Sequence, residues 1–334
     1  MKVSFFAVAL AVAFQNGPQL SAQAAPAVLV LQKKADSLGL YDSITAQRIW
    51  TAAVGAKPHE MVLSAGDRFA YVTDYGVDTY TDTAEGGRTI SVVDLAQGRR
   101  VATIDLGRFR RPHGITLGLS GRAYVTVDHP AAVIEVDLET RRVVGEHLLD
   151  QALPHMVAVS PDEQFLYAAN AGSGTVSIID RRSGGTTKHV RVGGVPMGLA
   201  LDRAGRLLYV ATREANIVAV IECSTGRVAR QIPLEGRPAR LRLTPDDGYL
   251  VVTLIGSGDL VVLDPASSRE VARLRIGAAA EGVTLDARSG FGYASAQGTN
   301  TVVKFSLTDW RRVLEIATDG SPDPIEVIQL QKTR

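Results

Sequence analysis

The chain has 334 residues, a formal net charge of +1 at pH 7 and a single cysteine, Cys223. The near-neutral charge gives no overall attraction to nucleic acid or to an anionic membrane surface, and one cysteine cannot form an intramolecular disulfide or a cysteine-based metal site. The composition is that of a globular protein with a sizeable core.

The N-terminus has the pattern of a secretory signal peptide. Lys2 supplies the positive start, residues 3–14 form an apolar run too short to span a bilayer, and Ala22-Gln23-Ala24 is a small-x-small cleavage site. We therefore expect residues 1–24 to be removed and residues 25–334 to form one domain in the periplasm or outside the cell. No later segment is long and apolar enough to predict a transmembrane helix.

A short Pro-His phrase, or an altered form of it, recurs along the rest of the chain. Its copies are Pro58-His59, Pro112-His113, Pro154-His155, Pro196-Met197, Pro238-Ala239, Ala280-Glu281 and Pro322-Asp323. From residue 112 to residue 322 these anchors follow one another at intervals of 42 residues, and the first gap, from 58 to 112, is longer by 12 residues. A fixed period near 40 predicts an array of identical supersecondary units.

Each period predicts four short strands. An apolar strand follows the anchor, a turn rich in Asp, Gly, Ser and Pro leads to a second strand, the third strand ends in an acid, and the fourth precedes a glycine. Four antiparallel strands per period make one propeller blade. The last anchor keeps only its first strand, and residues 27–32, 38–43 and 49–55 supply the other three. The sequence therefore predicts an all-β, seven-bladed β-propeller whose ring closes by pairing the N-terminal strands with the C-terminal strand.

Several of these strands share a recognisable signature. The Tyr-Val-Thr-Asp of residues 71–74, the Tyr-Val-Thr-Val of residues 124–127 and the segment from Asn170 to Asp180 resemble the YVTN family of bacterial propeller repeats, within the lactonase-like propellers. The resemblance covers essentially the whole mature chain and implies the seven-bladed fold. It implies no single function, because similar propellers include surface proteins, a periplasmic DNA-binding protein, amine dehydrogenase subunits, the haem d1 domain of nitrite reductase and 6-phosphogluconolactonase.

Most recurrent polar residues have a structural interpretation. The acids that end the third strands are predicted to cap turns, and they are Asp42, Asp94, Asp137, Asp180, Glu222 and Asp264. The recurrent tyrosines Tyr71, Tyr124, Tyr167, Tyr209 and Tyr293 are predicted to pack between blades. Cys223 is expected to be a buried, inert thiol, and His147 and His189 are expected to face solvent on outer strands. No familiar catalytic signature is present.

The residues that depart from the repeat point to one face. The anchors should form a ring around the upper mouth of the central channel, where His59, His113 and His155 lie in one arc with Glu281 and Asp323. The insertion, within residues 75–88, and the loop that carries Asp128 and His129 belong to the same face. Imidazoles and carboxylates that converge are the usual ligands of a divalent metal. The candidate metal ligands are His59, His113, His155, His129, Asp323 and Glu281.

Arginine and tyrosine side chains surround this predicted mouth. Arg108, Arg110 and Arg111 lead into the second blade, and Arg237, Arg240 and Arg242 lead into the fifth. Guanidinium groups at such a site select an anionic ligand. The candidate ligand-binding residues are Arg110, Arg111, Arg237, Arg240, Tyr75 and Tyr80. A nucleic-acid partner is not expected, because no aromatic series is interleaved with the arginines.

Several functions remain open from the sequence. The first is a binding or scaffold protein that presents this pocket to a small anionic ligand, a metal or a protein partner. The second is a metal-assisted hydrolase or lyase of the lactonase kind, or an accessory in the handling of a haem or quinone cofactor. The histidines can also be purely structural, each bonding a backbone carbonyl. We expect a monomer, because a closed propeller leaves no strand edge to pair.

Overall fold

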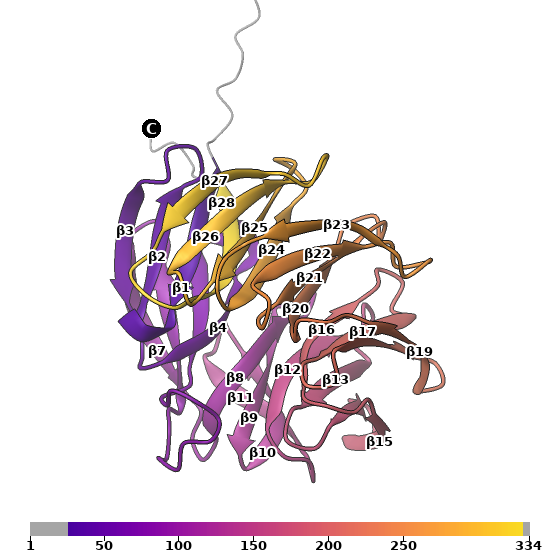
Figure 1. The fold of residues 1–334 in the computed structure, drawn as a ribbon. Coiled ribbons are helices and arrows are strands. Elements are labelled where there is room, and N and C mark those ends of the chain that lie inside the picture. Colours follow the sequence, from indigo (N-terminus) through magenta and orange to yellow (C-terminus); the bar gives the residue numbers. More distant parts are fainter. Residues whose placement is uncertain (1–25, 330–334) are drawn as a thin grey trace, which may run out of the picture.

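The computed structural model describes residues 26–329, which form a ring of seven four-stranded antiparallel sheets (Figure 1). The predicted all-β, seven-bladed fold is confirmed. The predicted signal peptide lies outside the described residues. Across residues 26–329 the helical segments are two short 3-10 turns, and neither approaches the length and apolar character that a membrane crossing needs. These turns are η1 (Lys33–Ala35) and η2 (Ala65–Asp67).

Each blade runs from an inner strand beside the channel to an outer strand at the rim. Blade 1 contains β4 (Pro58–Leu63), β5 (Phe69–Asp74), β6 (Thr89–Asp94) and β7 (Arg99–Asp105). Blade 2 contains β8 (Arg110–Leu117), β9 (Arg122–His129), β10 (Ala131–Asp137) and β11 (Arg142–Leu148). Blade 3 contains β12 (Pro154–Val159), β13 (Phe165–Asn170), β14 (Thr175–Asp180) and β15 (Gly185–Arg191).

The second half of the ring repeats the same order. Blade 4 contains β16 (Pro196–Leu201), β17 (Leu207–Thr212), β18 (Ile217–Glu222) and β19 (Arg227–Pro233). Blade 5 contains β20 (Pro238–Leu243), β21 (Leu250–Leu254), β22 (Asp259–Leu263) and β23 (Glu270–Arg275). Blade 6 contains β24 (Ala280–Asp286), β25 (Phe291–Ala296), β26 (Thr301–Ser306) and β27 (Arg312–Ala317).

Blade 7 joins the two ends of the chain. It combines β28 (Pro322–Gln329) with β1 (Pro26–Gln32), β2 (Ser37–Asp42) and β3 (Arg48–Ala53). Strands β1 and β28 pair antiparallel, with Val28 opposite Val327, so that the yellow C-terminal strand lies beside the indigo N-terminal strands in Figure 1. The predicted ring closure is therefore confirmed, and the seam is held by strand hydrogen bonds.

The core lies between the blades. The buried apolar residues form seven clusters, and each cluster draws side chains from two neighbouring blades. The recurrent tyrosines belong to these clusters; Tyr71 of blade 1, for example, packs with Leu138 of blade 2. The prediction that these tyrosines pack between blades is confirmed. The alternating Val, Ile and Leu residues of each strand explain this arrangement, because successive side chains of a strand point to opposite faces of its sheet.

The residue that precedes each anchor has an uncommon backbone conformation in most blades. The residue before the anchor has a left-handed conformation in six blades, with φ between 47° and 62° at Lys57, Arg111, Leu153, Arg237, Ala279 and Ser321. Acceptors on the preceding blade hold several of these residues: the amide N–H of Lys57 donates to Asp36 Oδ1 at 2.7 Å, and that of Ser321 donates to Asn300 Oδ1 at 2.8 Å. A register shift follows each anchor, between Pro58 and Met61 in blade 1. A bulge of this kind redirects side chains.

Hydroxyl side chains of the second strands join neighbouring inner strands. Thr73 Oγ1 accepts from the Glu60 amide at 3.0 Å and donates to the carbonyl of His113 on the next blade at 2.8 Å. Thr126 makes the same bridge to the carbonyl of His155 at 2.7 Å. Blades approach so closely here that a Cβ on Gly114 would lie 2.4 Å from the His155 carbonyl oxygen. These contacts fix where each anchor side chain lies.

We expect the substitution Thr73→Val to lower the free energy of unfolding by about 1–3 kcal/mol, because two buried backbone groups lose their shared partner. Urea unfolding followed by circular dichroism measures the change. Thr51→Val is the matched control, since Thr51 is exposed on the outer strand β3. Equal stability of the two variants would contradict a bridging role for Thr73.

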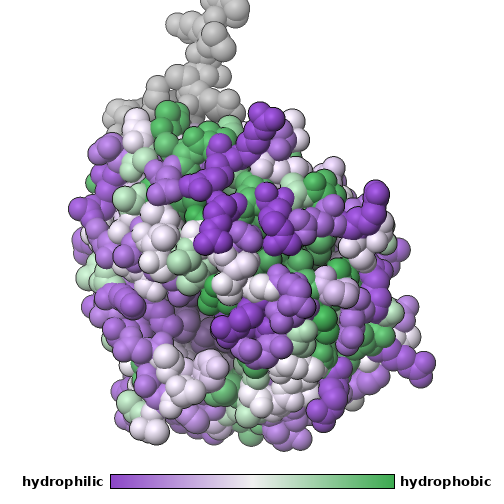
Figure 2. Space-filling model, in the orientation of Figure 1, coloured by the Kyte–Doolittle hydropathy of each residue, from purple (hydrophilic) through white to green (hydrophobic). Residues whose placement is uncertain are grey.

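The outer surface of the ring carries both hydrophilic and hydrophobic residues. Figure 2 shows hydrophilic residues over most of the visible face, with hydrophobic residues scattered among them. The exposed large apolar side chains include Ile44 and Leu119, which lie in turns of different blades. Single apolar residues of this kind are normal on a soluble protein.

Candidate functional site at the upper mouth of the channel

Three histidines from consecutive blades stack at the upper mouth. The ring centroids of His59 and His113 are 4.0 Å apart with the planes inclined by 34°, and those of His113 and His155 are 4.0 Å apart with the planes inclined by 40°. The imidazoles are buried, with exposed fractions of 5–9%. The structure thus brings the three predicted anchor histidines together. We call His59, His113 and His155 the histidine stack.

The histidine stack is held in the neutral form. Burial lowers the pKa of each of the three imidazoles well below its usual value, and the neighbouring cation Arg240 lowers it further. Lys33 Nζ lies 2.9 Å from His59 Nε2, and Asp323 Oδ2 lies 3.6 Å from His59 Nδ1. Within residues 26–329, the Nδ1 atom of each stacked ring is buried without a hydrogen-bond partner.

The inserted loop packs onto the histidine stack through Tyr75. The Tyr75 ring meets His59 and His113 edge-on at centroid distances of 4.9 Å and 5.0 Å, and its hydroxyl donates to Asp128 Oδ2 at 2.8 Å. Burial raises the pKa of Asp128 to about 6. Buried Arg111 donates to the backbone carbonyls of Asp82 and Ala84 in the insertion. Tyr75 and Arg111 therefore fix the insertion over blades 1 and 2.

Ion pairs occupy the other side of the mouth. Arg240 of blade 5 reaches across the channel to Glu60 of blade 1, and its Nη2 lies 3.8 Å from Asp323 Oδ1 of blade 7. Arg213 of blade 4 reaches Glu281 of blade 6 at 3.2 Å. Burial raises the pKa of Glu60 and that of Glu281 above the usual range. We call these residues, together with Lys33, the charged cluster.

Lys33, Glu60 and Arg213 were not among the sequence-predicted site residues. The sequence could have indicated Glu60 as a site residue, because it directly follows an anchor at a position where three other blades have glycine. Lys33 and Arg213 lie in loops between second and third strands. They reach the mouth through contacts between blades, which the repeat pattern does not encode.

Other predicted residues lie away from the histidine stack. Arg110 pairs with Glu85 at 2.6 Å, and Arg237 is exposed and pairs with Glu214 at 2.6 Å. Tyr80 is exposed in the insertion. His129 is exposed at the end of β9, and no hydrogen bond, ion pair or ring contact joins it to the histidine stack in the described part of the chain. Arg242 lies further down the inner strand than expected and lines the channel.

The predicted metal ligands do not form a metal centre among the described residues. The imidazoles of neighbouring blades lie 4.0 Å apart between centroids, with their planes tilted by 34° and 40°. Across residues 26–329, no group of three histidine, cysteine, aspartate or glutamate side chains is placed to hold an ion. Asp323 and Glu281 are instead engaged with Arg240, His59 and Arg213.

The prediction that His147 faces solvent and the prediction that Cys223 is buried within a strand were wrong. His147 is buried, with Nε2 3.0 Å from Glu135 Oε1, because it occupies the outer-strand position where other blades bury an aliphatic residue such as Ile104 or Ile232. His189 is half-buried and lies 2.8 Å from Asp150. Cys223 is half-buried and follows β18 instead of lying within it.

The turn-capping prediction for the recurrent acids is confirmed. Asp42 Oδ1 accepts from the amides of Ile44 and Thr45 at 2.8 Å. The other acids also accept hydrogen bonds from residues of the turn that follows them, and these acids are Asp94, Asp137, Asp180, Glu222 and Asp264.

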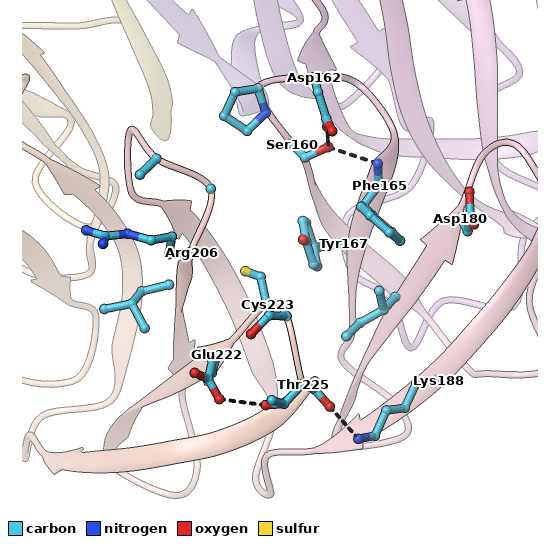
Figure 3. A pocket seen from close by; sticks show the side chains of 17 residues that line it. Ser160, Asp162, Phe165, Tyr167, Asp180, Lys188, Arg206, Glu222, Cys223 and Thr225 are labelled. Carbon is cyan, nitrogen blue, oxygen red and sulfur yellow. Dashed lines mark hydrogen bonds between the residues drawn. The ribbon is translucent and has the colours of Figure 1, made fainter.

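A groove of about 1230 Å³ opens between the turns of blades 3 and 4, away from the upper mouth (Figure 3). Its walls include Phe165, Tyr167, Lys188 and Cys223. Blades 1, 2 and 6 place a leucine directly after the third-strand turn position, at Leu95, Leu138 and Leu307. The smaller Cys223 stands at this position in blade 4 and lines the groove.

Comparison with known proteins identifies the same fold. The family model for the lactonase seven-bladed β-propeller matches residues 51–230. None of the curated proteins matches this sequence.

Solved structures with this fold include hydrazine synthase of Kuenenia stuttgartiensis, at 20% identity and a TM-score of 0.73, with 89% of this chain and 100% of that chain covered. The periplasmic gluconolactonase of Pseudomonas aeruginosa is similar at 17% identity and a TM-score of 0.72, with 91% and 99% covered. A dihydro-heme d1 dehydrogenase is similar at 14% identity and a TM-score of 0.66, with 94% and 77% covered. At these identities the likeness shows the fold alone.

Proposed function

Because the chain belongs to the lactonase seven-bladed β-propeller family, we propose that it is an exported propeller that binds a small hydroxycarboxylate at the upper mouth of its channel. The observation that carries this proposal is the group of buried polar atoms at that mouth that lack a partner within hydrogen-bond distance. Within residues 26–329 these atoms include Nδ1 of His59, His113 and His155, Nε of Arg213 and Oδ1 of Asp323. Buried polar groups are normally satisfied, so such a group indicates a missing polar ligand or water.

The chemistry of these atoms favours a ligand with both hydroxyl and carboxylate groups. Arg213 donates only, Asp323 accepts when ionised, and a neutral imidazole nitrogen does either according to its tautomer. Hydroxyl groups serve all three, and a carboxylate is best matched by a guanidinium. The insertion held by Tyr75 and Arg111 covers the histidine stack, so the ligand would reach it by displacing Lys33 or this loop.

Hydrolysis of a lactone is the second candidate, and the Lys33 ammonium group 2.9 Å from the His59 imidazole favours it. A neutral imidazole accepts a proton from water, the resulting hydroxide adds to the lactone carbonyl, and the ring C–O bond breaks with the proton returned to the leaving alkoxide. Lys33 would stabilise negative charge on the carbonyl oxygen. The product of this reaction is a hydroxycarboxylate, the same class of molecule as the proposed ligand.

Calorimetry of the purified mature chain with D-gluconate tests the binding proposal. We expect saturable binding that weakens about 10- to 100-fold in Arg213→Met, because a charge-assisted hydrogen bond contributes about 1.5–3 kcal/mol. Arg213→Lys, which keeps the charge, should lose less. His129→Ala is the control and should bind as the parent does, since His129 lies outside the histidine stack. Absence of binding, or equal binding by Arg213→Met, would overturn the proposal.

A parallel assay with D-glucono-δ-lactone decides between the two functions. Base uptake by the released acid is followed at constant pH, and the spontaneous rate is subtracted. Acceleration that is lost in His113→Gln, with gluconate binding retained, would establish a hydrolase. Gluconate binding without acceleration would leave a binding protein.

A further inference from the structure

A second polar cavity lies inside the channel, beyond the salt bridge that crosses it. The cavity has a volume of about 180 Å³ and is lined by inner-strand residues of several blades. Glu60 and Arg240 form its boundary with the upper mouth. Arg242 lies two residues after Arg240 on β20, and Glu326 lies on β28, three residues after Asp323. Met61 and Met156 contribute apolar wall. The cavity is thus separate from the histidine stack.

One wall of the cavity carries two guanidinium groups from β20. Arg240 is only 4% exposed, and its Nη2 is engaged by Glu60. Its Nη1 is buried with no hydrogen-bond partner in the described range. Arg242 is half-buried, and among the described residues its one hydrogen bond is a long 3.4 Å contact from Nη1 to the carbonyl of Leu241. An unsatisfied buried guanidinium N–H is costly, and an acceptor in the cavity would satisfy it.

The volume and the donors limit the occupant. A water molecule takes about 30 Å³ of liquid volume, so 180 Å³ corresponds to about six water molecules. Two guanidinium groups on one wall match the oxygens of a carboxylate or an oxyanion. We propose that this cavity binds a small oxyanion or carboxylate, held by Arg240 and Arg242. The proposal does not rest on the hydroxycarboxylate site, because Arg242 and Glu326, which line this cavity, take no part in that site.

The facing carboxyl groups make anion binding dependent on pH. Burial raises the pKa of Glu326 to about 7, Arg242 opposes this shift, and Asp67 adds to it. Burial also raises the pKa of Glu60, which faces Arg240, Asp323, Arg242 and Glu281. Below pH 7 both carboxyls gain protons, so they donate hydrogen bonds and no longer repel an anion. Affinity should therefore rise as the pH falls from 8 to 6.

Thermal unfolding with acetate, nitrate and phosphate as probes, at constant ionic strength, tests the proposal. We expect at least one of these anions to raise the melting temperature in a saturable way, while the bulky anion p-toluenesulfonate does not. Arg242→Met should weaken the response about 10- to 100-fold, as loss of a charge-assisted hydrogen bond implies. Glu326→Gln should strengthen binding at pH 8 and reduce its pH dependence. Acetate alone would indicate a carboxylate as the natural occupant, and nitrate or phosphate an inorganic anion.

Matched variants separate this site from the upper mouth. Arg213→Met should leave the anion response unchanged, and Arg242→Met should leave gluconate binding unchanged. Equal stabilisation by small and bulky anions would overturn the proposal, because it would mean a general salt effect. An unaltered response in Arg242→Met would overturn it as well. Failure of gluconate binding with the anion response intact would count against the proposed function alone.

Discussion

Replacing Arg240 with leucine should lower the free energy of unfolding by about 3–5 kcal/mol at pH 8, the cost of leaving a buried charge without its partner. Arg240 is buried and is the counterion of Glu60, and it also lies near Asp323. Without the guanidinium, both carboxylates remain in the channel. Urea unfolding followed by the fluorescence of Trp50 and Trp310 measures the loss.

The same substitution should cost less at pH 5. The folded-state pKa of Glu60 is raised above its unfolded value, so ionised Glu60 opposes folding and this penalty grows as the pH rises from the unfolded pKa through the folded one. Protonation at pH 5 removes the penalty. Arg240→Leu combined with Glu60→Leu should recover part of the stability, whereas Arg206→Leu, at an exposed arginine, should have almost no effect. Equal losses at the two pH values would contradict this account.

Removing β28 should abolish folding altogether. A chain that stops after Ser321 loses the inner strand of blade 7, the partner of β1 and the buried residues Ile325 and Ile328. Each of these side chains contributes about 1.5–3 kcal/mol through burial. The edge of β1 would also be open to pairing with other chains. Soluble yield and circular dichroism measure the outcome.

A chain that stops after Gln329 is the control for this truncation, because it keeps every residue of β28. It should melt cooperatively, as the full chain does. A cooperative transition of the shorter chain near the same temperature would show that the seam is dispensable.

The fold was predictable because the period of 42 residues repeats one local pattern. Each blade carries its own anchor, turn residues and alternating apolar positions, so four strands and their order follow from any one repeat. The same argument placed His59, His113 and His155 on one face. The repeat could also have placed His147 in the core, because it aligns this residue with Ile104 and Ile232.

The chemistry of the mouth was less predictable, because it depends on contacts across the ring. Arg240 and Glu60 are 180 positions apart in the sequence and meet only because the blades close into a circle. The repeat placed the three histidines on one face but not the orientation of their rings. The rotation from blade to blade brings the imidazole rings within 4.0 Å of one another, with planes tilted by 34° and 40°, and metal binding by these histidines stays a prediction.

The core of residues 26–329 is divided into seven clusters shared between neighbouring blades, and this division determines which parts of the molecule can unfold locally. A linear array of repeats has end units with one neighbour each, and these units fray first. In this ring, the pairing of β1 with β28 gives every blade two neighbours. A single blade can then detach only by breaking two apolar interfaces at once, so slow amide exchange should extend around the whole circle without a weak terminus.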